Sequence, residues 1–142
     1  LAEAALLAAQ RSGERRNQMT ALFLVTIARD LSGDLKGALA AGRQVMNANP
    51  PADDDIRIRA SQSVGIILAR IGRTDEAEPL LRAAVTNHEK QNAIAEQARS
   101  IIALADALAS GGDRRGAMSV LERGAGRTHV GCARAPDRER TA

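Results

Sequence analysis

The chain has 142 residues, of which 44% are hydrophobic and 26% charged, and its formal net charge is +3. A single cysteine, Cys132, allows no internal disulfide, and no apolar run approaches the roughly 20 residues that cross a bilayer. Length and composition therefore exclude a disulfide-stapled scaffold and membrane insertion, and they predict one folded domain in a reducing, cytoplasmic compartment.

Aromatic residues make up only 1% of the chain, with Phe23 and no Trp or Tyr. The core must then be built from Ala, Leu, Ile and Val, whose small side chains let helices approach closely. No convincing alternation of polar and apolar residues indicates a strand. We therefore predict an all-α fold.

The first residues, LAEAALLAAQRS, are strong helix formers and follow no initiator methionine. We expect this helix to end at Gly13 and the charged residues after it, and we expect the chain to be part of a larger bacterial protein. Further helices are predicted over residues 17–31, 35–47, 55–71, 75–88, 92–109 and 114–123. Residues 127–142 lose apolar periodicity and are predicted to form a flexible tail or linker.

Glycines end three of these helices at a regular spacing. Gly33, Gly72 and Gly112 can take the left-handed conformation that stops a helix, and they lie 39 (72 − 33) and 40 (112 − 72) residues apart. An alanine follows each glycine five residues later. The alanines are Ala38, Ala77 and Ala117. A period of this length is typical of stacked helical hairpins.

This pattern resembles the tetratricopeptide repeat family over residues 17–126. That family places a glycine between the helices of a hairpin, a small residue five positions later and often a proline after the second helix, as Gly33, Ala38 and Pro50 do here. The segment DEAEPLL at residues 75–81 and the long period resemble the variant found in kinesin light chains and large bacterial regulators. The resemblance divides a repeat domain of residues 1–126 into a truncated repeat at 1–16 and full repeats at 17–54, 55–91 and 92–126.

The fold implied by the resemblance is a stack of antiparallel hairpins that forms a short right-handed α-solenoid. Its implied function is that of a non-catalytic protein-interaction or scaffold module, which binds a peptide or partner helix in a concave groove. The alternative is a sensory or regulatory repeat domain of a transcription regulator, ATPase or kinase. The apolar stripe of residues 1–12 additionally predicts self-association, or packing against sequence outside this chain.

In this family the first helix of each hairpin lines the groove. Carried over position by position, the groove residues are Phe23, Ile27, Arg59, Gln62, Ile66, Arg70, Arg99, Ile102 and Asp106. Spacings of three and four place the members of each helix on one stripe. The three arginines predict a ligand with acidic residues, whereas the alternative interpretation makes them ordinary solvated surface residues.

No catalytic, cofactor-binding or metal-binding residue is predicted, so an enzyme is not expected. His88, near a helix end, is interpreted as a polar residue favourable to the helix dipole. His129 and Cys132 are one pair of potential zinc ligands without a second pair. The acidic residues 53–55 are interpreted as a helix cap rather than a cation site. Scarce aromatics argue against nucleic-acid binding.

Overall fold

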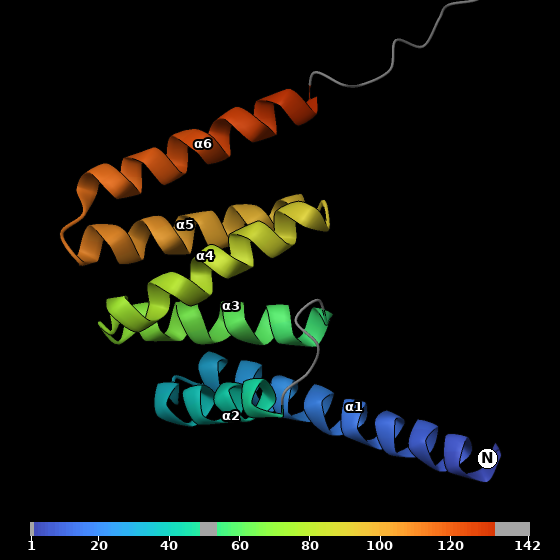
Figure 1. The fold of residues 1–142 in the computed structure, drawn as a ribbon. Coiled ribbons are helices and arrows are strands. Elements are labelled where there is room, and N and C mark those ends of the chain that lie inside the picture. The colour runs from blue at the N-terminus through green and yellow to red at the C-terminus, as the bar shows by residue number, and fades with distance from the viewer. Residues whose placement is uncertain (1, 49–53, 133–142) are drawn as a thin grey trace, which may run out of the picture.

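The computed structural model describes the backbone of residues 2–48 and 54–132, and in these ranges it contains helices and no strand. The helices are α1 (Ala2–Leu31), α2 (Leu35–Asn47), α3 (Asp55–Arg70), α4 (Thr74–Lys90), α5 (Ile94–Ser110) and α6 (Arg114–Cys132). Helices adjacent in the chain pack together, and α3 also contacts both α1 and α5. Figure 1 shows the resulting stack, which runs in chain order from α1 and α2 to α6. The predicted all-α class is confirmed.

Left-handed residues form the tight turns between helices. Gly33, Gly72 and Gly112 have φ values of 83°, 84° and 93°. At the second of these turns the amide of Arg73 donates to the carbonyl oxygen of Leu68 at 2.9 Å, which closes the last turn of α3. The glycine turns follow the sequence prediction.

A fourth left-handed turn lies at Asn92, whose φ is 53°. The predicted helix start at this residue is wrong by two positions, because Asn92 lies within the connection from α4 and α5 begins at Ile94. Asparagine tolerates the left-handed region better than most residues that have a side chain.

Aspartates begin three of the helices. The carboxylate of Asp34 accepts a hydrogen bond from the amide of Gly37 at 2.9 Å, and Asp113 accepts one from Gly116 at 2.8 Å. Asp54 accepts from the amide of Ile56 at 2.9 Å, as the predicted cap of α3 requires. Each bond satisfies an amide that has no acceptor within the helix.

Helix α1 continues without interruption through Gly13. The predicted break there, and the separate helix at residues 1–16, are therefore wrong. A glycine destabilises a helix by only about 1 kcal/mol, and the surrounding Ala, Leu, Glu, Arg and Gln residues are strong helix formers without a proline among them. Most side chains of residues 1–12, on which the predicted self-association depends, lie outside the described part of the chain.

Helix α6 continues to Cys132, so the prediction of a tail from residue 127 is wrong for the first part of that stretch. Gly124 lies inside this helix, where the backbone of α6 approaches Ile101 of α5 closely. A Cβ added at Gly124 would lie only 2.9 Å from the Ile101 Cδ1 atom. The remainder of the predicted tail, residues 133–142, and the side chains of His129 and Cys132 lie outside the described residues.

Small and aliphatic side chains fill the space between the helices. The larger buried cluster joins α2 to α6 and includes Ala38, Val64, Ile67, Leu68, Ala77, Leu81, Leu104, Leu108, Ala117 and Val120. Gly42 allows α2 to approach α3 closely, because a Cβ there would lie 2.5 Å from the Cγ2 atom of Val64. Among the described helices, none is both long enough and apolar enough to cross a membrane.

Two glycine-to-alanine changes test this close approach. We expect Gly42→Ala to lower the free energy of unfolding by about 1–2 kcal/mol, because the stiff Val64 side chain must move, which outweighs a gain in helix propensity of about 1 kcal/mol. Gly13→Ala, whose Cβ meets nothing within 4 Å, should instead raise it by up to about 1 kcal/mol. Urea unfolding of both variants checks this, and equal effects would contradict the contact.

Candidate functional site

The three predicted groove arginines are half or more exposed, and each is paired with an acid. Arg59 lies 3.1 Å from a carboxylate oxygen of Asp55, and Arg99 lies 3.6 Å from one of Glu96. Both pairs join residues of the same helix. Arg70 of α3 pairs with Asp30 of α1, so this contact links the first helices of two successive hairpins. The arginines therefore lie on an accessible surface of α3 and α5.

The predicted apolar groove residues divide into two kinds. Ile27 and Ile102 are exposed, whereas Phe23 and Ile66 are half-buried and pack against the core. Asp106 of α5 is also exposed. Apolar side chains on α1 and α5 thus remain accessible beside the arginines.

Gln62 is not an accessible groove residue, because its exposed fraction is only 4%. Its Nε2 atom donates to the Oγ atom of Ser100 at 2.8 Å and to the carbonyl oxygen of Glu96 at 3.2 Å. Gln62 therefore fastens α3 to α5, and its assignment to a ligand-binding surface is wrong.

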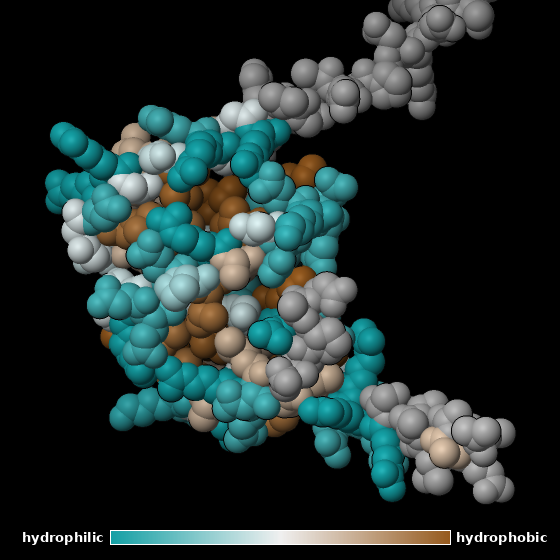
Figure 2. Space-filling model, in the orientation of Figure 1, coloured by the Kyte–Doolittle hydropathy of each residue, from teal (hydrophilic) through white to brown (hydrophobic). Residues whose placement is uncertain are grey.

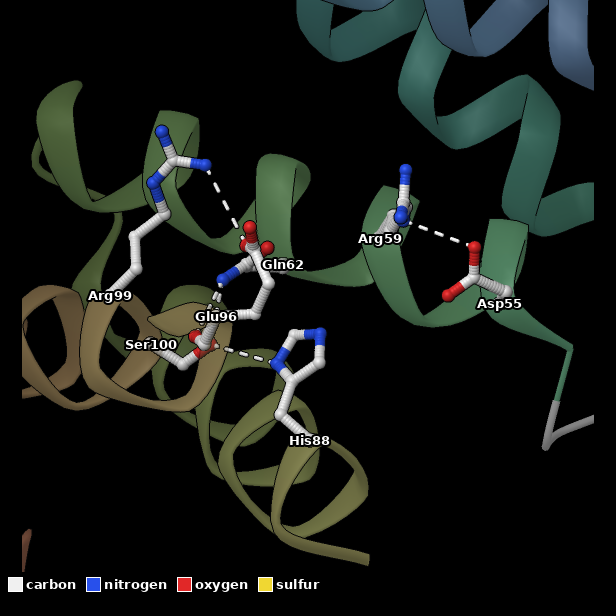
Figure 3. Close-up of polar contacts among 7 residues, drawn as sticks. All are labelled: Asp55, Arg59, Gln62, His88, Glu96, Arg99 and Ser100. Atoms are coloured by element: carbon white, nitrogen blue, oxygen red, sulfur yellow. Dashed lines mark hydrogen bonds and ion pairs between the residues drawn. The ribbon is translucent and has the colours of Figure 1, made fainter. Parts of the chain in front are cut away.

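His88 joins the same buried cluster from α4 (Figure 3). Its Nδ1 atom lies 3.3 Å from the Oγ atom of Ser100, whose hydroxyl donates to the carbonyl oxygen of Glu96 at 3.0 Å. The single hydrogen of that hydroxyl is donated to Glu96, and one lone pair of Oγ accepts from Gln62. The other lone pair of Oγ therefore accepts from the N–H of His88, which we assign to Nδ1 of the neutral imidazole. Gln62, His88 and Ser100 together satisfy one another and connect three helices.

Burial lowers the pKa of His88 below its ordinary value, although the carboxylates of Glu96 and Asp55 act in the opposite direction. The side chain lies in the last turn of α4, as predicted, but its exposed fraction is 2%. The interpretation of His88 as a helix-end residue favourable to the dipole is therefore wrong, since that effect needs the charged form.

The cluster of Gln62, His88 and Ser100 is closed to solvent. All three side chains are buried, so no substrate reaches the hydroxyl or the imidazole. No group of three or more potential metal ligands occurs among the described side chains. Sequence patterns could not reveal this cluster, because its members come from three helices and each occupies an ordinary helical position.

Among the described residues, two clefts lie at the C-terminal end of the stack, and none of the three predicted arginines lines either of them. The larger, about 250 Å³, lies among α4, α5 and α6, with Val85, Ile101 and Val120 among its apolar residues and Arg82 and Arg127 among its polar ones. Figure 2 shows apolar surface framed by hydrophilic side chains below α6.

The smaller cleft, about 170 Å³, lies between α5 and α6. Ile94, Ala98 and Ile102 of α5 line one side, and Leu121 of α6 lies opposite. Ile102 is the one residue of the predicted groove that lines either cleft. The family resemblance predicts a groove on the first helix of each hairpin, whereas these clefts lie between neighbouring helices.

Comparison with known proteins finds no matching family model, no similar curated protein and no similar solved structure. The assignment to the tetratricopeptide repeat family therefore stays a prediction from the sequence.

Acidification tests the state of His88. Because its pKa is lowered in the folded protein, protonation favours the unfolded chain, so stability is fully present above about pH 6.5 and is lost as the pH falls through the lower folded pKa. We expect the free energy of unfolding of the parent, measured relative to that of His88→Gln, to fall between about pH 7.5 and pH 5. Urea titrations at several pH values measure the difference, and a constant or growing difference would contradict a buried neutral imidazole.

Proposed function

We propose that the chain is a non-catalytic protein-interaction module of the tetratricopeptide type, with its hairpins wound into a short right-handed superhelix. Its ligand is a peptide or partner helix with acidic and apolar residues, bound over α1, α3 and α5. The contacts of α3 with α1 and α5 support this arrangement, because they bring the first helices of successive hairpins side by side. Left-handed turns 39 and 40 residues apart support it as well.

The ion pair between Arg70 and Asp30 is the observation that carries the proposal. It joins α3 to α1 across the boundary between two hairpins, with the Arg70 side chain half exposed. An arginine at this position therefore reaches a carboxylate that belongs to a neighbouring helix. A carboxylate on a bound peptide can make the same contact, and guanidinium groups bind carboxylates with defined geometry.

Exchange of these ion pairs for ligand contacts costs little. Arg59, Arg70 and Arg99 pair with acids at exposed positions, where an ion pair stabilises a protein by only about 0–1 kcal/mol. A ligand that excludes water from the same arginines gains charge-assisted hydrogen bonds of about 1.5–3 kcal/mol each. The exposed side chains of Ile27 and Ile102 provide apolar contact for such a ligand.

Two matched triple variants test the proposal. Arg59→Gln, Arg70→Gln and Arg99→Gln remove the proposed binding arginines, and Arg43→Gln, Arg73→Gln and Arg82→Gln remove three others that are also exposed and ion-paired. Both triple changes lower the net charge from +3 to 0 (3 − 3). A difference between the variants then reports on position and not on total charge.

The probe is a library of random peptides selected on the parent protein. We expect selected sequences enriched in Asp, Glu and Leu, with affinity at least about tenfold weaker for the first triple variant and within about twofold of the parent for the second. Isothermal titration calorimetry with one selected peptide measures both. Equal losses would indicate non-specific attraction, and no loss in either variant would place binding elsewhere; each result overturns the proposed site.

A further inference from the structure

The two ends of the stack carry apolar residues that the interior of the stack buries. Residues 39 apart in the first and second hairpins, or 40 apart in the second and third, occupy equivalent places, because Gly33, Gly72 and Gly112 end equivalent helices. Each exposed residue at an end of the stack thus has a counterpart in the interior.

The first end is the side of α1 that no described helix precedes; we call it the N-terminal face and define it by Ala21 and Val25. Val25 is 39% exposed, whereas its counterparts Val64 and Leu104 are buried. Ala21 is exposed, whereas its counterparts in α3 and α5 are fully buried. The preceding hairpin covers these places, as the close approach of Gly42 to Val64 in α3 and the hydrogen bond from Gln62 to Ser100 in α5 show.

The second end is the side of α5 and α6 that no described helix follows; we call it the C-terminal face and define it by Ile102 and Leu121. Ile102 is 57% exposed and Leu121 is 40% exposed. Their counterparts in the second hairpin, Gln62 and Leu81, are buried where α5 packs on α3 and α4. The smaller cleft described above lies on this face.

The two faces match each other in the way that successive hairpins do. At the first junction of the stack Phe23 packs against a cluster that contains Ala60, and at the second Gln62 donates to Ser100. The same two places on the open faces hold Ile102 and Ala21. Ile102 and Ala21 are a large and a small apolar residue, as Phe23 and Ala60 are at the first junction. Apolar residues therefore replace both members of the polar pair found at the second junction, Gln62 and Ser100.

A second pair of places repeats the match. Gly42 faces Val64 at the first junction, and Leu81 and Leu104 belong to one buried cluster at the second. On the open faces these places hold Leu121 and Val25, which are both apolar. Burial of such a pair stabilises an association through the hydrophobic effect.

Charges at the edge of the two faces are also complementary. Within the stack Arg43 of α2 pairs with Glu76 of α4 at 3.1 Å. The place of Arg43 in the third hairpin is held by Glu122, and the place of Glu76 in the first hairpin is held by Gly37, beside Lys36. Both charged side chains are exposed, and their signs are opposite.

We propose that the C-terminal face of one copy of this chain binds the N-terminal face of a second copy, so that the stack continues head to tail. Residues 133–142 are a poorer occupant of the C-terminal face, because they contain no Leu, Ile, Val, Met or Phe to fill a cleft lined by isoleucine and leucine. A head-to-tail contact uses two different surfaces and leaves one of each free, so the association is open-ended.

Single-face variants test this association. Ile102→Glu blocks the C-terminal face and Ala21→Glu blocks the N-terminal face, whereas Ile71→Glu changes an exposed isoleucine of the middle hairpin, outside both faces. Each blocking change should weaken association at least about a hundredfold, because it would bury an unpaired carboxylate. The parent and the Ile71→Glu control should increase in mean mass with concentration in sedimentation equilibrium.

An equimolar mixture of the two blocked variants gives the most specific result. Each retains one intact face, and together they can form a single head-to-tail contact and no more. We expect either variant alone to be monomeric and the mixture to form a complex of two chains. Association of Ala21→Glu alone or of Ile102→Glu alone would indicate a symmetric contact and would overturn the proposal.

A parent protein that stays monomeric up to about 1 mM would also overturn it, since even weak contacts with millimolar Kd become populated there. Circular dichroism establishes that each variant is folded.

Because Ile102 also belongs to the proposed peptide-binding surface, Leu121→Glu on α6 repeats the test outside that surface. Loss of self-association in Leu121→Glu with unchanged peptide binding separates this inference from the proposed function.

Discussion

Each hairpin buries an alanine five residues after its left-handed glycine, and this small side chain permits close contact between the two helices. The glycine follows α1, α3 or α5, and all three alanines are buried: Ala38, Ala77 and Ala117. A larger side chain at any of these places would push the two helices apart. Because the chain has one aromatic residue, bulky side chains cannot fill wider gaps, and the stack is held by many contacts of small and aliphatic groups.

The two junctions between successive hairpins differ in chemistry. The first is apolar around Phe23 and Ala60, whereas the second contains the hydrogen-bonded set of Gln62, His88 and Ser100. A buried polar set of this kind is satisfied in one arrangement of the three helices and costly in others, so it fixes how α5 sits on α3 and α4. Arg59, Arg70 and Arg99 are engaged in exposed ion pairs, which supports their proposed role in ligand binding.

Much of the fold could be predicted because its signals are local. The glycine turns and the aspartate caps are set by backbone conformation, and they fixed most helix ends to within two residues. The break expected at Gly13 failed because a single glycine is a weak signal within strong helix formers. The site was harder, since the groove positions carried over from the resemblance placed Gln62 on the same stripe as Arg59. Gln62 is buried against Ser100, which lies 38 residues away in the sequence. No local sequence pattern indicates a partner at that separation.

Amide hydrogen exchange along the native chain tests most directly the claim that neighbouring hairpins stabilise one another. At a concentration at which the protein is monomeric, we expect the slowest exchange in α3 and α4, which have hairpins on both sides, and faster exchange toward both ends of the stack. The first turns of α1, which extend beyond the helices packed on it in Figure 1, should exchange fastest. Uniform protection, or strongest protection in α1, would contradict a stack stabilised by contacts between neighbours.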